Sequence, residues 1–419
     1  MSGLKITDIE TIILDVPFHP IPTRVMERGY NGWHIVEMCR VTTDAGLVGW
    51  GETLPHYTWG RVTPEAIARA KGQNPADLMW DETLGAGLQM ALFDVVGKAA
   101  GVPVYRLLGN KVRDWCPVSW WSIDQSAEEC ALEAARAVSE GYLSYKQKAR
   151  PWFDPWEQAR RTAEVVPAHF KLDFDFNETL LNAGQAVAVL KDLEDHCPNI
   201  SIFESPIIQN DMEGNRRIRQ QIRSGLALHY NYQLMEAVRA GALDGFVNDG
   251  SPNKILRQAR LAEEANLPFW LQMVGTAWTT AMSLHLGAVC TQAQWPAVTC
   301  MNLYVDQLVT QPLKAQGGMM RVPEAPGLGL EFNEAALKWR VDSIDKPNVR
   351  ALYAIVRPHG ERLWYKGEVE AGGYWEDAMR GNLPMFERGT RLERWDDDGT
   401  PEWHELRRRV EAGPVRSQA

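Results

Sequence analysis

The sequence predicts an α/β protein built around a parallel barrel of TIM type, with a separate α+β domain ahead of it. From residue 115 onward, eight short apolar segments recur at intervals of about 20 to 30 residues, with helical patterns between them. Strand and helix alternating in this way favour a closed parallel barrel. Before residue 115 this rhythm is absent, and two long alternating segments stand in its place.

The α+β domain is expected over residues 1–114. Residues 5–18 and 34–54 alternate apolar and polar side chains, as half-buried strands do, and we expect a hairpin around Asp44-Ala45-Gly46. Residues 84–101 then follow a helical pattern.

The barrel is expected over residues 115–316. A capping-box spacing of Ser126 and Glu129 marks one helix start between its strands, and Asp154 before Pro155 marks another. The eight predicted strands lie in the segments CPVSWWSI, LSYKQKA, FKLDFDF, ISIFESPI, GLALHY, GFVND, PFWLQMV and AVTCMNL.

Two further parts follow the barrel. Residues 317–342 are rich in turn residues, and we expect them to return to the N-terminal domain. Residues 343–419 form a C-terminal extension with a predicted hairpin at residues 357–364 and a predicted helix at residues 401–410.

Composition excludes some classes of function. The formal charge is -10, and no basic stretch of the kind that follows a phosphate backbone is present, which argues against nucleic acid as a partner. No apolar run reaches the length of a membrane span, and the N-terminus alternates like a strand rather than resembling a signal peptide. We expect a cytoplasmic homo-oligomer with a small-molecule substrate and no membrane partner.

Polar residues at the predicted strand ends indicate where the chemistry lies, because parallel barrels carry their active sites at that end. Lys146 and Lys148 end the second strand and project from the same face, since alternate residues of a strand point the same way. The next three strands end with Asp173, Asp175 and Asn177, with Glu204, and with His229, Tyr230 and Asn231.

This set of residues suggests removal of a proton next to a carboxylate. Converging carboxylates raise each other's pKa unless a cation neutralises them, and hard oxygen ligands favour Mg²⁺ or Mn²⁺. Such an ion stabilises an enediolate, and a lysine whose pKa is lowered by cationic neighbours serves as the base.

The segments YKQKA, LDFDFN and FESP, with ALFDVVGKAAGVPVYRLLG before them and VPEAPGLGLEF after them, resemble the enolase superfamily, in the branch of mandelate racemase and muconate lactonizing enzyme. The resemblance implies a capping domain over a modified (β/α)7β barrel. It implies that Lys148 is the base and Lys146 its electrostatic partner, and that Asp175 and Glu204 are the first two metal ligands.

The chain departs from this family pattern on the later strands. His229 stands where the family has a third carboxylate, and Tyr230 and Asn231 are the other candidates for that ligand position. The missing carboxylate puts the ion in doubt, because imidazole suits Mg²⁺ less well than softer metals. Gln272 stands where a racemase of the family has its histidine.

Residues on strands six and eight also bear on the comparison. The racemase-type aspartate corresponds to Asn248 or Asp249, and Lys254 falls beyond the place of the muconate-type lysine. We expect the substrate to contact Asn177, Gln272 and Asn302.

Each candidate also has a structural interpretation. The two lysines taken alone are typical of a solvated strand end, and His229 can be a metal ligand, an acid/base group or a hydrogen-bonded core residue. Loops at residues 17–34 and 54–62 are expected to determine specificity. An apolar wall for the substrate is expected among tryptophans near strand ends, namely Trp120, Trp121, Trp152, Trp156, Trp270 and Trp278.

For function, the sequence favours a metal-assisted lyase that dehydrates a hydroxy-carboxylate such as a sugar acid, because a single-base elimination needs one good proton acceptor. A racemase or epimerase, which usually needs two opposed bases, is the alternative within the family. A non-catalytic descendant that binds a carboxylate without turnover is the alternative from another class.

Overall fold

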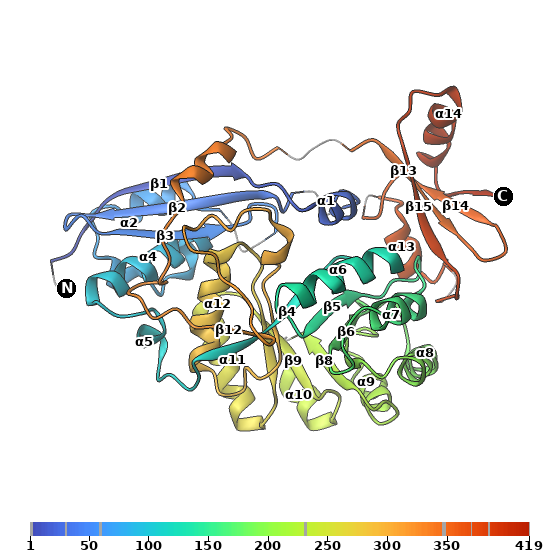
Figure 1. Cartoon of the computed structure of the whole chain (residues 1–419), viewed down its shortest axis with the longest axis horizontal. Helices are drawn as coiled ribbons and strands as arrows, with labels where there is room; N and C mark the ends of the chain where they lie inside the picture. The colour runs from blue at the N-terminus through green and yellow to red at the C-terminus, as the bar shows by residue number, and fades with distance from the viewer. Residues whose placement is uncertain are drawn as a thin grey trace.

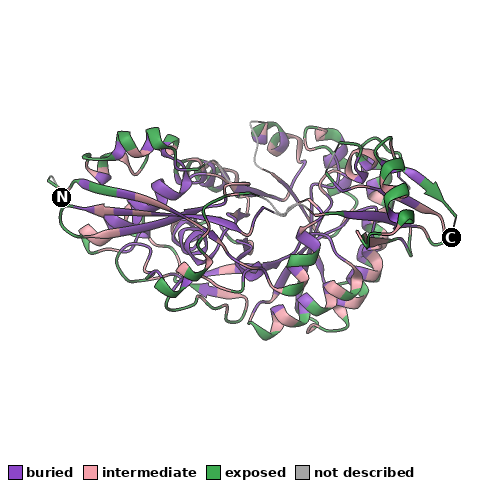
Figure 2. Cartoon of the chain, turned by 90° about the horizontal axis from the view of Figure 1, so that it is seen from above, coloured by how far each residue is buried: buried purple, intermediate pink, exposed green. Residues whose placement is uncertain are grey.

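The computed structural model describes residues 3–29, 32–57, 61–229, 233–345, 349–369, 371–383 and 386–418. Figure 1 shows a barrel with an N-terminal sheet and a C-terminal sheet placed at opposite sides of one of its ends. The two chain termini lie at opposite extremes of the molecule (Figure 2).

The N-terminal unit is a three-stranded antiparallel sheet, in the order β1-β2-β3, with helices on one face. The hairpin predicted around Asp44-Ala45-Gly46 is confirmed as the turn between β2 and β3, with Gly46 at a φ of 73°. Gly51 lets α4 approach β3, because an added Cβ would lie 2.2 Å from the Gly87 carbonyl oxygen. The elements are β1 (Ile6–Asp15), α1 (Pro20–Met26), β2 (Ile35–Thr43), β3 (Val48–Thr53), α2 (Pro64–Ala70), α3 (Pro75–Leu78), η1 (Glu82–Leu84), α4 (Ala86–Ala100) and α5 (Tyr105–Leu108).

The predicted barrel is confirmed. Eight parallel strands follow one another in chain order from β4 to β11, and β11 pairs with β4 to close the sheet. Seven helices alternate with these strands in the described part of the chain, which is the (β/α)7β arrangement. The strands are β4 (Trp115–Trp121), β5 (Ser144–Lys148), β6 (Lys171–Asp175), β7 (Ile200–Glu204), β8 (Gly225–His229), β9 (Gly245–Asp249), β10 (Phe269–Gln272) and β11 (Ala297–Val298). The helices are α6 (Ala127–Ser139), α7 (Pro155–Ala163), α8 (Ala183–His196), α9 (Met212–Arg219), α10 (Leu234–Ala240), α11 (Pro252–Ala265) and α12 (Ala277–Val289).

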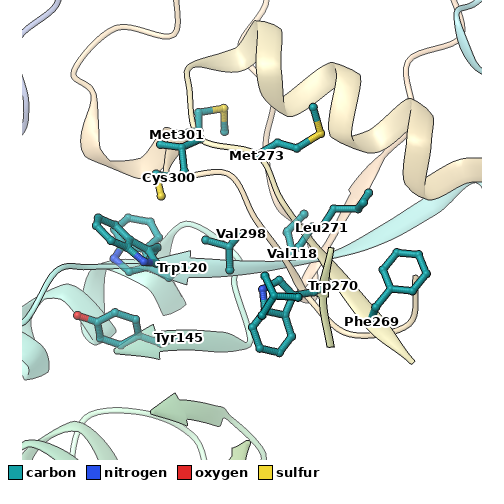
Figure 3. Close-up of a cluster of buried hydrophobic side chains, with 14 of the residues drawn as sticks. Val118, Trp120, Tyr145, Phe269, Trp270, Leu271, Met273, Val298, Cys300 and Met301 are labelled. Carbon is teal, nitrogen blue, oxygen red and sulfur yellow. The ribbon is translucent and has the colours of Figure 1, made fainter. Parts of the chain in front are cut away.

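Buried side chains from neighbouring strands fill the barrel and its surroundings (Figure 3). Trp270 on β10 is 1% exposed, and the Lys146 ammonium lies 5.3 Å from the centre of its ring. Figure 2 shows the complementary pattern, with buried strands inside and exposed faces on the outer helices. The Trp270 ring thus packs beneath Lys146 of β5.

The segment after the barrel returns along the N-terminal unit. After η2 (Met301–Leu303), β12 (Met319–Arg321) pairs antiparallel with β4, and η3 (Glu334–Trp339) leads to a bridge between Arg340 and Leu14 of β1. The domain boundaries at residues 114, 316 and 342 stay predictions.

The C-terminal unit is a four-stranded antiparallel sheet in the order β15-β13-β14-β16. The hairpin and the helix predicted for it are both confirmed, as β13–β14 and α14. Its elements are β13 (Ala351–Val356), β14 (Arg362–Tyr365), α13 (Tyr374–Met379), β15 (Arg391–Asp396), α14 (Pro401–Val410) and β16 (Val415–Ser417). Throughout the described ranges, every helix is too short or too polar to cross a membrane.

Candidate active site

Strand register brings the predicted site residues of β5, β6 and β7 to the same level of the barrel. Lys148 is paired with Asp175, and Asp175 is paired with Glu204. Lys146 is paired with Asp173, one layer below. Because strands in register end together, a lysine and two carboxylates lie side by side at the carboxyl end of the sheet.

The two lysines contact different partners. The Lys148 ammonium donates hydrogen bonds to Asp175 Oδ2 and to Asn177 Oδ1, the latter at 3.0 Å. The Lys146 ammonium lies 2.5 Å from Glu204 Oε2 and 3.6 Å from Asp175 Oδ2. It also donates to Gln272 Oε1 at 2.8 Å, so Lys146 is the more completely paired of the two.

These contacts shift the pKa values of the two lysines in opposite directions. Burial lowers the pKa of Lys148, Asp175 opposes this effect, and the positive charges of Lys146 and Arg150 add to it, so that the pKa falls below its ordinary value. Burial also lowers the pKa of Lys146, but Glu204 and Asp175 outweigh burial and raise it. Lys148 is therefore the lysine that loses its proton more readily, as a general base must.

His229 lies at the end of β8 between two carboxylates. Its Nε2 is 3.0 Å from Glu204 Oε1, and its Nδ1 is 3.6 Å from Asp249 Oδ2. Burial lowers the pKa of His229, but the contacts with Asp249 and Glu204 outweigh burial and raise the pKa to about 9. The imidazole is therefore protonated at neutral pH.

A cavity of about 250 Å³ opens at this end of the barrel. Aromatic side chains form much of its wall, and its polar side chains include Lys148 and His229. A larger hollow of about 850 Å³ lies elsewhere, beside residues 301–317, and contains none of the converging lysines or carboxylates. The smaller cavity is lined by Trp33, Tyr57, Trp121, Ile123, Lys148, Arg150, Asn177, His229, Gln272, Val274, Cys300 and Trp375.

The family model for enolase C-terminal domain-like proteins matches residues 129–336. The N-succinyl-L-Arg/Lys racemase of Bacillus cereus is 24% identical over 375 residues, covering 80% of this chain and 97% of the racemase. Muconate cycloisomerase 1 of Pseudomonas putida is 25% identical over 374 residues, covering 80% and 98%. A solved mandelate racemase/muconate lactonizing family protein from Azoarcus sp. EbN1 has a TM-score of 0.65 at 24% identity, covering 82% and 98%. The chain belongs to the mandelate racemase/muconate lactonizing branch of the enolase superfamily.

Relatives in the enolase superfamily are named for different reactions. Besides the racemase and the cycloisomerase, they include sugar-acid dehydratases, all at similarly low identity. Membership therefore supports an enzyme that acts on a small carboxylate, and it leaves the individual reaction to be argued from the site.

Magnesium binding is typical of the superfamily, but the described side chains as they lie do not fit the ion. No group of three or more His, Cys, Asp or Glu side chains among them is arranged to hold a metal. The Lys146 ammonium lies between Asp175 and Glu204, and His229 presents a protonated nitrogen to Glu204. The assignment of Asp175, Glu204 and His229 as ligands stays a prediction.

Of the predicted site residues, Lys148, Asn177, His229 and Gln272 line the cavity. Lys146, Asp175 and Glu204 are buried next to them and are joined to them by ion pairs. Asn302 is buried and exchanges hydrogen bonds with the backbone of Trp121, and it does not line the cavity. Tyr230 and Asn231 lie outside the described residues. Of the six tryptophans proposed as a wall, Trp121 alone is among the cavity-lining residues of the described chain.

Sequence reasoning missed five residues of the cavity: Ile123, Val274, Cys300, Arg150 and Trp375. Arg150 and Trp375 are the charged and the aromatic side chain among them. Arg150 was detectable, because it follows Lys148 by two residues in KQKAR and continues the alternation that aligns the lysines. Trp375 carried no signal in the sequence, since nothing there places the C-terminal unit beside the barrel. The loops expected to determine specificity contribute Trp33 and Tyr57.

Proposed function

We propose that this chain is a lyase that removes the α-proton of a small hydroxy-carboxylate and expels its β-hydroxyl, as in the dehydration of a sugar acid. The observation that carries the proposal is the single lysine of lowered pKa, Lys148, at the wall of the cavity. Gln272, on β10, does not exchange protons, so one base on one side of the cavity suits a single-base elimination.

The proposed reaction has two steps and uses Lys148 and His229, which line this cavity, together with the buried Lys146. Lys148 Nζ takes the α-proton, and the electron pair of the broken C–H bond forms an enediolate, whose charge the Lys146 ammonium and the His229 imidazolium stabilise. The C–O bond at the β-carbon then breaks, and the leaving oxygen takes a proton from His229 to become water. The enol product tautomerises to a 2-oxo-3-deoxy acid, Lys148 returns its proton to solvent, and His229 regains a proton from solvent.

The Mg²⁺ or Mn²⁺ expected from the sequence, on Asp175 and Glu204, belongs to the hypothesis of a metal-assisted lyase. No step above depends on it, because the side chains as they lie place Lys146 between those carboxylates.

A racemase or epimerase is the second candidate, and the position of His229 favours it. His229 and Lys148 line one cavity from β8 and β5, so an imidazole and an amine are both available to a carbon between them. A racemase would return a proton to the opposite face of that carbon, whereas a dehydratase yields a 2-oxo acid.

The test is incubation of the protein with a panel of aldonic and aldaric acids in D₂O. We expect at least one acid to lose its α-proton signal and to yield a 2-oxo acid that reacts with semicarbazide. Lys148→Met should abolish both signals, whereas Lys171→Met, at the opposite end of the barrel, should leave them unchanged. If the α-carbon is inverted and no 2-oxo acid forms, the racemase replaces the lyase as the proposed function. If no acid of the panel exchanges its α-proton, both functions are refuted.

A further inference from the structure

The C-terminal unit packs directly on the mouth of the barrel. Trp152 and Phe153, from the loop after β5, belong to the same buried apolar cluster as Tyr353, Tyr365 and Tyr374 of the unit. The rings of Trp152 and Tyr374 meet edge to face with centroids 4.8 Å apart. The C-terminal unit therefore shares a core with the loop that follows the lysines.

One side chain of this unit reaches the cavity. Trp375, in the first turn of α13, lines the cavity, and its ring lies 4.9 Å from the guanidinium carbon of Arg150. An arginine stacked on an aromatic face keeps its plane fixed, and its N–H groups stay free to bind.

Arg150 is a buried cation without a carboxylate partner. It is 1% exposed, it donates from Nη1 to the Asp175 carbonyl oxygen at 3.0 Å, and it donates from Nη2 to Asn177 Oδ1. Its Nε is buried and has no acceptor. Within the described ranges, no carboxylate oxygen lies at ion-pair distance from this guanidinium, and the Asp175 and Glu368 carboxylates interact with it only over longer distances.

Other arginines at the same interface are paired. Arg28, also buried, lies 3.2 Å from Asp124. Arg388 stacks on Trp156 at 4.8 Å and lies 2.6 Å from Asp192. Because an unpaired buried charge is costly, the missing counter-charge of Arg150 at a cavity wall indicates an anionic ligand.

We propose that Arg150 binds a carboxylate of the substrate and that Trp375 positions its guanidinium, so that the C-terminal unit completes the active site. This inference rests on the proposed function for the identity of the ligand, a small hydroxy-carboxylate. Asn177 Oδ1 accepts hydrogen bonds from both Lys148 and Arg150, so the base and the anchor are adjacent. A carboxylate held by Arg150 places its neighbouring carbon beside Lys148 Nζ.

The test measures binding separately from turnover. Saturation-transfer NMR and calorimetry with D-gluconate, galactarate, L-tartrate and D-lactate give affinities for the wild-type protein and its variants. Arg150→Met should weaken the affinity for the best-bound acid at least about tenfold, because a charge-assisted hydrogen bond is lost. Arg388→Met is the matched control and should bind as the wild type does.

Two conservative variants separate positioning from folding. Trp375→Ala should weaken binding, and Trp375→Phe should restore most of it, since a flat ring is what holds the guanidinium. Arg150→Lys keeps the charge and should bind with intermediate affinity, which keeps the test decisive if Arg150→Met does not fold.

The outcomes distinguish this inference from the proposed function. If binding of the acid depends on Arg150 but no α-proton exchange occurs, the lyase is refuted and the role of Arg150 as an anchor is supported. If α-proton exchange occurs and neither Arg150→Met nor Arg150→Lys changes the affinity for the acid, the role of Arg150 as an anchor is refuted and the lyase is not. If no acid of the panel binds the wild-type protein, the anchor is refuted as well.

Discussion

Replacing His229 by glutamine should remove a positive charge from between Glu204 and Asp249. With a pKa of about 9, the imidazole is about 99% protonated at pH 7, against about a quarter for an ordinary histidine. Glutamine keeps a polar side chain of similar size, so the substitution tests the charge rather than the packing.

The magnitude follows from the difference between the folded and unfolded pKa values. A rise from 6.5 to about 9 corresponds to about 3 kcal/mol of stability. The folded pKa is the higher one, so this contribution is fully present below pH 6.5 and is lost as the pH rises through about 9. The difference in unfolding free energy between wild type and His229→Gln should thus be about 3 kcal/mol larger at pH 6 than at pH 9.5.

Urea unfolding at the two pH values measures that difference, and proton NMR of the histidine ring hydrogens measures the pKa itself, with His229→Gln supplying the assignment. His285→Gln is the control of opposite sign, because burial lowers the pKa of His285 to about 4. At pH 6 the unfolded state binds the proton that folded His285 does not, so the stability difference between wild type and this variant should be about 1 kcal/mol smaller at pH 6 than at pH 9.5. A His229 midpoint at or below 6.5, or a stability difference independent of pH, would show that Glu204 and Asp249 do not hold the proton.

Three further predictions follow from the described contacts. Lys148→Ala should abolish α-proton exchange with substrate while circular dichroism stays that of the wild type; retained deuterium incorporation would remove Lys148 from the role of base. His229→Asp should bind Mg²⁺ more tightly than the wild type in calorimetry, because it replaces a cation with a third carboxylate, and equal affinities would contradict the cationic state of His229. Glu52→Gln should lower the unfolding free energy by about 1 to 3 kcal/mol, since the Glu52 carboxylate accepts three hydrogen bonds from the start of α12. Glu10→Gln, on the surface, is its control, and equal midpoints in thermal unfolding would count against the Glu52 contacts as a source of stability.

The barrel was predictable because its signal is local. Each strand is a short apolar segment, each helix repeats its apolar residues every turn, and alternation of the two admits few parallel architectures. The adjacency of Lys148, Asp175 and Glu204 followed from the same logic, since each residue ends a neighbouring strand and parallel strands end at one edge.

The tryptophans show where such reasoning stops. Trp120 and Trp270 lie close to strand ends in the sequence, yet both are buried in the packing of the barrel, with exposures of 0% and 1%. A strand-end position gives the level of a residue in the barrel. The face on which its side chain lies depends on register and twist, which only the closed sheet determines.

The sequence by itself determined the order of the strands, the level at which the lysines and carboxylates meet, and the family to which they belong. The tertiary structure decided the rest of the cavity, because Trp33, Tyr57 and Trp375 come from segments far apart in the chain. It also decided the charges. His229 holds its proton because two carboxylates from other strands face it. Arg150 keeps a buried Nε without an acceptor, because no described carboxylate lies at ion-pair distance from its guanidinium. Charge state and exposure depend on all neighbours in space, whereas a sequence pattern reports only those along the chain.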